Sequence, residues 1–595
     1  MFKPSLTLCT VLLFSFSLWA QNNFFTDAGA NRMIISNGQR VITPQHFRSA
    51  ALDVNGMKNF LWSLPAESRI NAQRTQSPVL SLPMPDGSIA RFHVWESPVM
   101  APGLMAKFPG IKTFAGQGID DPYATIRLDY NPYFGFHAQV LSPVKGRFFI
   151  DPYARGDVSN YISYFAKDNP RQVSAVCEIP VEILPDPGTA NRPAAGPCRG
   201  TSLKTYRLAL ACTGEYSEAV AGPTPTKAAV LAAIVTSVNR VTGVYETELA
   251  IRLELIANNN EIIYLDNAGD PYTNSSGSAM LSQNQTNLDN VIGTANYDVG
   301  HVFSTGGGGV ATLNSPCNPS TKARGVTGLS NPVGDAFDID FVAHEMGHQF
   351  GAPHSFNSVT GGCSGNRSST DAYEVGSGTT IMGYAGLCSS DNIQPNSDPF
   401  FHTISFDRIS NFVETGGGSL CGVSTPNGNT LPVITSMENN GVSIPISTPF
   451  TLTGSATDAN GDAITYCWEE WDLGPSTSWN GGNANTTSPL FKSRVPKTSG
   501  SRTFPDMNVI LFNYPASPPA TMGGLKGETL PTQARTMNFR LTVRDNRAGG
   551  GGVVTGGDGC QVGFTSFFTV NAVATPGPFV VTAPNGGESF TAGSS

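Results

Sequence analysis

Residues 344–354 read His-Glu-Met-Gly-His-Gln-Phe-Gly-Ala-Pro-His, and they constrain this chain more than any other stretch. The chain has eight histidines, and three of them fall within these residues. His344 and His348 are four residues apart, so on a helix their imidazoles project from one face. That spacing allows two imidazoles to bind one zinc ion. Glu345 lies beside them, where a carboxylate can take a proton from water at such a metal.

The residues that follow favour a catalytic zinc site over a structural one. Gly351 accepts the left-handed conformation of a sharp turn, so the chain can leave the helix there and bring His354 back as a third ligand. The fourth zinc position then stays open for water, which is typical of catalytic sites. A bare His-Glu-x-x-His arises by chance in helices, whereas the extended pattern constrains five positions at set spacing.

This pattern resembles the zinc signature of the metzincin metallopeptidases, which also carry a methionine turn below the metal. Residues 379–386 read Thr-Thr-Ile-Met-Gly-Tyr-Ala-Gly, and Met382 fits that turn. Within the clan the chain is most similar to the bacterial reprolysin-like group, related to the adamalysins. The resemblance extends over roughly residues 200–422 and includes the segments that begin at Tyr206 and at Asn296. It implies an α/β catalytic domain at 201–422 with a zinc helix, acting on proteins or peptides.

Two residues depart from the adamalysin pattern. Ser355 follows the third histidine where adamalysins usually carry Asp, and Tyr384 stands two residues after the turn methionine where they carry Pro. Met-x-Tyr is instead what astacins and serralysins show, where the tyrosine can bind zinc and swing away. Tyr384 is therefore a candidate zinc ligand and transition-state donor, or alternatively a packed tyrosine of the turn.

The N-terminus predicts export. Residues 1–20 read as a signal peptide, with Lys3 as the positive start and a mostly apolar run from Leu6 to Leu18 that is too short for a membrane span. No later run reaches that length, so we expect a secreted or cell-surface protein, bacterial by its resemblance, without an integral membrane anchor. The net charge of −9, without a basic cluster, argues against a nucleic-acid partner.

The chain is long enough for several domains, and composition divides it. Residues 21–200 carry short alternating segments and resemble the β-rich prodomain of such enzymes, which would inhibit its own peptidase. A Pro/Gly-rich stretch from Leu184 to Pro197 reads as an exposed linker, so activation cleavage is expected nearby, after Arg192 or Arg199.

The alternating segments of residues 432–573 predict an immunoglobulin-like or cadherin-like β-sandwich, and residues 576–595 look like the start of a further β domain that is incomplete here. The expected fold is therefore multidomain: a β-rich prodomain, an α/β metzincin domain with a zinc helix and methionine turn, and a C-terminal sandwich. Asp458 to Asp462 resembles acidic loops that bind Ca²⁺, although an ordinary Asx-rich turn fits the same residues.

Nine cysteines remain once Cys9 leaves with the signal peptide, an odd number in a compartment where disulfides persist. A free thiolate could occupy the open zinc position and keep a precursor latent, or it could be buried without a role. Cys177 is the candidate for this switch and Cys198 the runner-up, although the Cys-Gly sequence of many such switches is missing at Cys177. The expected disulfides join three pairs, of which the first follows the adamalysins: Cys317 with Cys421, Cys363 with Cys388, and Cys467 with Cys560.

Three functions remain open. The leading hypothesis is a secreted zinc endopeptidase, made as a latent precursor, with Glu345 as general base and an edge strand within His301–Leu313 that binds the substrate backbone. The alternative is an adhesive or binding protein with a non-catalytic metzincin domain, which the trailing β domains would suit. A third is a zinc hydrolase of non-peptide amides. Dead relatives usually lose the glutamate or a ligand, and neither is lost here.

Overall fold

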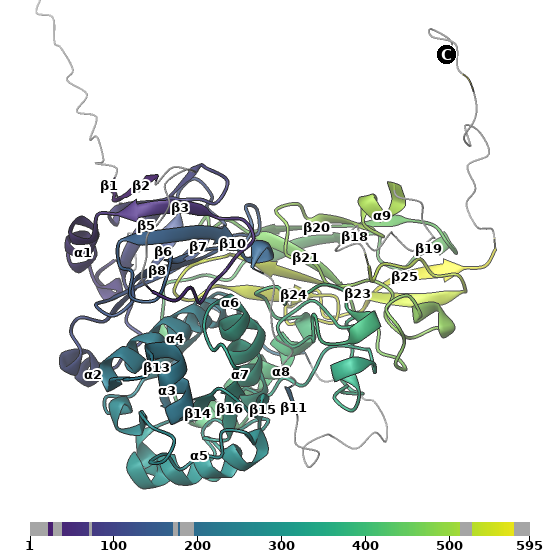
Figure 1. Ribbon diagram of the computed structural model, residues 1–595. Helices are drawn as coiled ribbons and strands as arrows, with labels where there is room; N and C mark the ends of the chain where they lie inside the picture. The colour runs from purple at the N-terminus through teal and green to yellow at the C-terminus, as the bar shows by residue number, and fades with distance from the viewer. Residues whose placement is uncertain are drawn as a thin grey trace, which may run out of the picture.

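The computed structural model describes residues 22–27, 38–70, 74–169, 177–178, 195–511, 526–575 and 589. The expected signal peptide, Arg192 and nearly all of 576–595 lie outside these ranges. Figure 1 shows three units, which we call the N-terminal sheet (residues 22–165), the central unit (residues 202–426 together with Cys177–Glu178) and the C-terminal sandwich (residues 433–573). The central unit lies below the N-terminal sheet in this view, and the sandwich lies beside both.

The N-terminal sheet has ten strands in the order β1-β4-β5-β6-β7-β8-β9-β10-β3-β2. Alternation of apolar residues builds it; in β5, for example, Phe92 and Val94 are buried on one face. Two helices, α1 (Val54–Trp62) and α2 (Pro102–Lys107), accompany the sheet. The strands are β1 (Asn22–Asn23), β2 (Phe25–Asp27), β3 (Arg48–Leu52), β4 (Val79–Pro83), β5 (Ile89–Glu96), β6 (Lys112–Gly118), β7 (Thr125–Asn131), β8 (Gly135–Leu141), β9 (Phe148–Pro152) and β10 (Asn160–Phe165).

The central unit is built on a sheet with the strand order β11-β15-β16-β14-β12-β13, and β17 pairs with β12. Neighbouring strands are parallel except that β15 runs antiparallel to β16 and β17 antiparallel to β12. Among the described residues, only the two-residue strand β11 lies beyond β15. The strands are β11 (Cys177–Glu178), β12 (Ser202–Cys212), β13 (Ile251–Leu255), β14 (Val299–Ser304), β15 (Gly309–Ala311), β16 (Gly325–Gly328) and β17 (Val423–Pro426).

The helices of the central unit cover both faces of this sheet (Figure 1). They are α3 (Gly214–Ala221), α4 (Lys227–Leu249), α5 (Gly277–Val291), α6 (Asp335–Phe337), α7 (His344–Gln349) and α8 (Thr403–Glu414). A π-helical stretch, Asp338–Ala343, joins α6 to α7. The zinc helix expected near these residues is therefore present, but it is composed of three consecutive helical pieces.

Helix α4 is long and apolar enough to cross a membrane, so the expectation that no later run reaches that length is wrong. It is nevertheless a core helix, because 83% of its apolar window is buried inside the protein. The side chain of Thr226 caps its first turn by accepting from the backbone N–H of Ala229. Within the described ranges no other helix passes the same test of length and composition.

The N-terminal sheet packs against α4 through buried charges. Arg240 of α4 forms an ion pair with Asp151 of β9, and Glu246 of α4 pairs with Arg127 of β7. Each helix residue also has a partner within the central unit: Arg240 pairs with Asp338 at 3.2 Å, and Glu246 pairs with Arg252. Arg240 and Glu246 would thus each keep a partner if the N-terminal sheet separated from α4. This lowers the free energy required for the separation, because neither charge would be left buried and unpaired.

The C-terminal sandwich consists of a sheet β18-β20-β22 and a second sheet β19-β25-β23-β21 with β24 paired to β23. Its core includes Leu452, Trp468 and Phe539, all nearly or fully buried. The elements are β18 (Val433–Glu438), β19 (Val442–Pro445), β20 (Phe450–Thr457), β21 (Thr465–Glu470), β22 (Ser501–Phe504), α9 (Met507–Leu511), β23 (Arg535–Arg544), β24 (Val553–Gly556) and β25 (Phe568–Val573).

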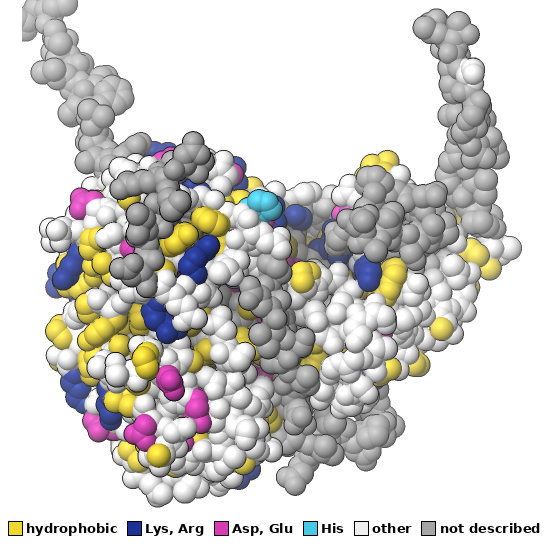
Figure 2. All heavy atoms as spheres, viewed as in Figure 1, with side chains coloured by type: hydrophobic (Ala, Val, Ile, Leu, Met, Phe, Trp, Pro, Cys, Tyr) yellow, Lys and Arg dark blue, Asp and Glu magenta, His cyan; other side chains and the backbone are white. Residues whose placement is uncertain are grey.

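The sandwich is docked firmly on the central unit. Arg544 of β23 forms a bidentate pair with Glu248 of α4 at 2.7 and 2.8 Å. Tyr373 stacks on Trp471 with ring centroids 4.2 Å apart. Both contacts are buried, so the two units form one continuous structure rather than domains on a loose linker. On the face shown in Figure 2, basic and acidic side chains lie interspersed rather than gathered by sign.

Candidate metal centre

The segment that carries the metal-ligand motif is helical up to Gln349 and then turns sharply. Gly351 has φ +101°, a conformation that side chains with a Cβ rarely adopt. A Cβ at Gly351 would also collide with the side-chain oxygen of Asn314. The glycine predicted to end the helix is therefore required both by its backbone conformation and by a close neighbour.

The structure brings His344, His348 and His354 together. The Nε2 atom of His354 lies 3.1 Å from Nε2 of His348 and 3.2 Å from Nε2 of His344. Three nitrogens bound at about 2.05 Å in a tetrahedral arrangement would be roughly 3.3 Å apart. The three residues are 0–2% exposed, so the cluster is shielded from bulk water.

Each imidazole is oriented by a backbone carbonyl on its far side. Nδ1 of His344 donates to the carbonyl of Ile381 at 2.6 Å, and Nδ1 of His348 donates to that of Ala352 at 2.6 Å. Nδ1 of His354 likewise donates to the carbonyl of Asn366 at 2.6 Å. Because every Nδ1 carries the proton, every Nε2 presents its lone pair to the centre, as metal-binding histidines do.

Burial supports the neutral form that a metal requires. It lowers the pKa of His348 and His354 well below the usual value, and the neighbouring imidazoles lower it further. A neutral imidazole can donate its lone pair to a metal, whereas an imidazolium cannot. The three nitrogens, their spacing and their orienting hydrogen bonds therefore fit a zinc ion.

The turn that contains Met382 lies directly beneath the histidines. Met382 is fully buried, and a Cβ at Gly347, between the two helical histidines, would collide with its sulfur. The preceding residue, Ile381, supplies the carbonyl that orients His344. Met382 thus packs against the helix beneath the histidines. Glycine at position 347 allows the sulfur of Met382 to approach the helix backbone closely.

Glu345 is fully buried and lies against strand β15. A Cβ at Gly309, the first residue of β15, would collide with the Glu345 carboxylate. The predicted edge region His301–Leu313 therefore contains β15, the strand that lies against Glu345. His301 itself lies on the interior strand β14. The role of Gly309 could not be predicted from the sequence, because the contact joins two separate elements.

The ring of Tyr384 packs among the same residues. Its centroid is 4.4 Å from that of His354 and 4.5 Å from that of Phe356, and the side chain is 2% exposed. Its ring therefore contacts a metal-ligand ring, which suits a packed tyrosine and also brings the residue to the metal centre. Both interpretations of Tyr384 remain consistent with this position.

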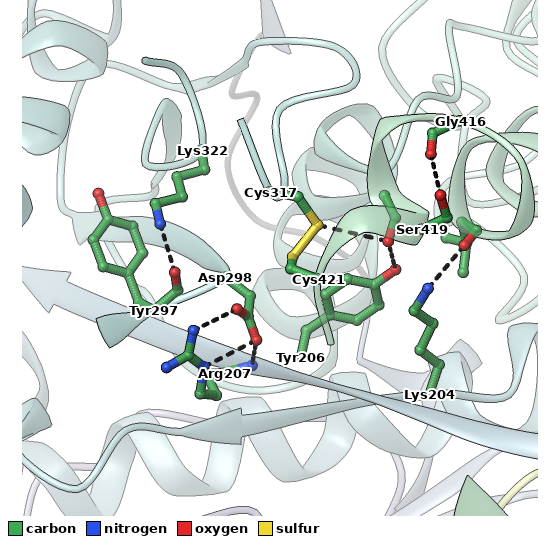
Figure 3. The surroundings of a disulfide bond; sticks show 12 residues. Lys204, Tyr206, Arg207, Tyr297, Asp298, Cys317, Lys322, Gly416, Ser419 and Cys421 are labelled. Atoms are coloured by element: carbon green, nitrogen blue, oxygen red, sulfur yellow. Dashed lines mark hydrogen bonds and ion pairs between the residues drawn. A yellow bond between two sulfur atoms is a disulfide. The ribbon is translucent and has the colours of Figure 1, made fainter. Parts of the chain in front are cut away.

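Two of the expected cysteine pairs are disulfides in the structure. Cys363 pairs with Cys388 in the loop before and after the methionine turn, and Cys317 pairs with Cys421. Figure 3 shows the second bond beside Tyr206, whose hydroxyl donates to the carbonyl of Gly418 at 2.6 Å. This disulfide connects the segment after β15 to the end of the central unit.

The expected pairing of Cys467 with Cys560 is wrong. Cys560 is bonded to Cys198, and Cys467 is a buried free thiol. Arg199 and Val553 exchange two backbone hydrogen bonds, of 3.1 and 2.8 Å, so the chain before β12 runs beside β24 and brings Cys198 to Cys560. Little in the sequence indicates this pairing, because the two cysteines are 362 positions apart.

Two expectations about the precursor change with that disulfide. Cys198 has no free thiolate for a metal, so it is excluded as the latency switch, and Cys212 is a buried free thiol. Cleavage after Arg199 is also contradicted, because Arg199 is 3% exposed and forms an ion pair with Glu414. The side chain of Cys177 and the alternative site, Arg192, lie outside what the structure describes.

The acidic loop of the sandwich gathers three carboxylates. Ligand oxygens of Asp458, Asp462 and Asp545 lie within 4.8 Å of one another. Arg547 already pairs with Asp462 at 3.2 Å, and Asp458 accepts from the backbone N–H groups of Asn460 and Asp462, as in an Asx-rich turn. Ca²⁺ binding at this cluster stays a prediction.

Comparison with known families bears on the central unit. Residues 202–411 match a family model described as "Metallo-peptidase family M12B Reprolysin-like". The match supports a reprolysin-like metallopeptidase domain in this part of the chain, and peptidases of this family generally bind zinc, which agrees with the histidine triad. No curated protein and no solved structure matches the chain.

Proposed function

We propose that this protein is a secreted zinc endopeptidase that is synthesised as a latent precursor. One observation carries the proposal: three imidazole Nε2 atoms converge, and the residue after the first of these histidines is the buried Glu345. The match of residues 202–411 to a metallopeptidase family supports the same class of enzyme. The secretory route rests on the signal-like residues 1–20 and on disulfides, which persist outside the cytosol.

The chemistry assigned to the site divides between metal and protein. Zinc, when bound, acts as a Lewis acid and lowers the pKa of water. His344, His348 and His354 would hold it, and Glu345 would take a proton from the attacking water and later pass it to the leaving amine. Tyr384, at the metal centre, is the proposed donor to the developing oxyanion.

The proposed binding site for the substrate backbone is strand β15. Apart from the two-residue strand β11, β15 is the outermost strand at this side of the described sheet, so its outer edge could pair with another extended chain once β11 leaves. Gly309 begins this strand and contacts Glu345, so a chain added there would lie beside the proposed base. Recognition through backbone hydrogen bonds would tolerate many substrate sequences.

Latency is proposed to arise because the precursor occupies that edge itself. Strand β11 pairs in parallel with β15, with Cys177 opposite Gly309. A substrate strand could not use the same edge while β11 is present. The paired charges on α4 would allow the N-terminal sheet to leave after cleavage, and Cys177 remains the proposed thiolate switch. A Cys177→Ala precursor should then show premature peptidase activity. If the variant precursor is as inactive as the parent precursor, Cys177 is not the thiolate switch.

A casein-cleavage assay with and without a chelator tests the proposed function. Processed protein should cleave casein, lose the activity when the metal is removed and recover it when zinc is added back. An adhesive protein with a non-catalytic domain would show no cleavage in any condition. A zinc hydrolase of non-peptide amides would leave casein intact while retaining zinc.

A further inference from the structure

Glu374 is a buried carboxylate that has no role in the chemistry described above. Its side chain is 1% exposed and accepts five hydrogen bonds, all from hydroxyl or backbone N–H groups of Ser355, Thr379 and Thr380. Among the described residues, none of the ion pairs involves Glu374. Hydroxyl and backbone N–H donors therefore hold this buried carboxylate in place.

One group of these contacts reaches the third metal ligand. Ser355 directly follows His354, and its hydroxyl donates to Oε2 of Glu374. The backbone N–H of Glu374 donates to the carbonyl of Ser355 at 2.8 Å, and the N–H of Asn357 donates back to the carbonyl of Glu374 at 2.8 Å. The segment that carries His354 is therefore attached to Glu374 by both side-chain and backbone bonds.

The second group reaches the turn that orients the first ligand. Oε1 of Glu374 accepts from the backbone N–H of Thr379 at 2.8 Å and of Thr380 at 3.2 Å, and Oε2 accepts from the Thr380 hydroxyl at 2.6 Å. The next residue, Ile381, supplies the carbonyl that holds Nδ1 of His344. One carboxylate thus joins the neighbours of two different ligands.

We propose that Glu374 is a positioning residue of the metal centre: it sets the position of His354 relative to His344 by joining Ser355 to the turn before Met382. Because the inference rests on the proposed metal site, its test must read metal binding directly. Residues that orient metal ligands typically contribute about 10–100-fold to metal affinity. Glu374→Ala would remove the acceptor of five hydrogen bonds and loosen both ligand segments.

The test uses the full chain and measures zinc affinity by competition with a chelator, together with the visible spectrum of the Co²⁺-substituted protein. We expect Glu374→Ala to weaken zinc binding about 10–100-fold and to change the cobalt spectrum. Glu374→Gln keeps one carbonyl oxygen, and the Ser and Thr hydroxyls can rotate to accept from its amide, so it should retain most of the affinity.

Glu469→Ala is the matched control. Glu469 is also fully buried and accepts from Thr403, Ser493 and Thr542, but it lies on β21 of the sandwich. Its loss should lower the melting temperature yet leave zinc affinity and the cobalt spectrum unchanged. If Glu374→Ala does not fold, Ser355→Ala removes a single donor and should still weaken zinc binding several-fold.

The outcomes separate this inference from the proposed function. Unchanged zinc affinity and cobalt spectrum in Glu374→Ala, or in Ser355→Ala where the first variant is unfolded, would overturn the positioning role while leaving the peptidase intact. An equal loss of zinc affinity in Glu469→Ala would also overturn it, because general destabilisation would then explain the effect. A parent protein that binds no zinc would reject the proposed function itself, and the positioning role with it.

Discussion

At the scale of single residues, the metal centre depends on groups that lie on both sides of each ligand. The spacing of His344 and His348 is local helix geometry, so the sequence predicts it well. The carbonyl that orients His344 belongs to Ile381, and the backbone beside Glu345 belongs to Gly309. Such partners come from other elements, and spacing along the chain carries no information about them.

Tyr384→Phe tests the role of the one residue whose two interpretations remain open. The ring should keep its packing against His354 and Phe356, so fold and zinc content should be those of the parent. If the hydroxyl stabilises the transition state, kcat should fall about 10²–10³-fold. Steady-state kinetics on a peptide substrate provides the measurement, and an unchanged kcat would make Tyr384 a packing residue of the turn.

At the scale of elements, alternation and helical periodicity predicted most pieces of the central unit. Alternation of Ile251, Leu253 and Leu255 predicts a strand, which is β13. Apolar residues at helical spacing from Thr226 to about Val241 predict a helix, and α4 continues to Leu249 because tertiary packing buries its last turns. The expected zinc helix divides at a π-helical stretch, which depends on local hydrogen bonding that periodicity does not reveal. Element type was therefore easier to predict than element ends.

Helix α8 begins with a titratable cap that should make the protein sensitive to acid. Nδ1 of His402 accepts from the backbone N–H of Ile404 at 3.2 Å, which requires an unprotonated nitrogen. Burial lowers the pKa of His402 from 6.5 to about 4. The unfolded chain therefore binds the proton first, and the stabilisation present above pH 6.5 is lost as pH falls toward 4.

His402→Asn keeps a capping side chain but removes the titration. It should reduce the loss of unfolding free energy between about pH 6.5 and pH 4, by up to ~1.4 kcal/mol per pH unit in the steepest part. Urea unfolding across this range provides the measurement. His301, whose pKa burial also lowers to about 4, should keep its own contribution. An identical slope in parent and variant would contradict the role assigned to His402.

At the scale of the whole molecule, the sequence predicted three β-rich or α/β regions but not how they are joined. The connection between Cys198 and Cys560 spans 362 residues and makes the sandwich part of the central unit. Cys467, the wrongly expected partner, lies on β21 and donates to the carbonyl of Arg494 instead. Odd cysteine counts allow many pairings, and only the three-dimensional course of the chain distinguishes them.

Loss of this long-range disulfide should destabilise the assembled molecule. We expect Cys198→Ser with Cys560→Ser to lower the unfolding free energy by about 2–4 kcal/mol, because the unfolded chain gains freedom. Cys467→Ala, which breaks no disulfide, is the control and should have a smaller effect. Denaturant unfolding measures both, and peptide mapping under non-reducing conditions should recover a linked Cys198–Cys560 peptide. A linked Cys467–Cys560 peptide would contradict this arrangement.

Glu345→Ala tests the central claim most directly, because it removes the proposed base and leaves the three histidines in place. The variant should fold, retain one zinc per chain by elemental analysis and lose about 10²–10⁴-fold in kcat on a protein substrate. The carbonyl contacts that orient the three histidines do not involve Glu345, so metal content should not depend on it. Near-normal turnover in Glu345→Ala, or an active parent without stoichiometric zinc, would contradict the proposed peptidase mechanism.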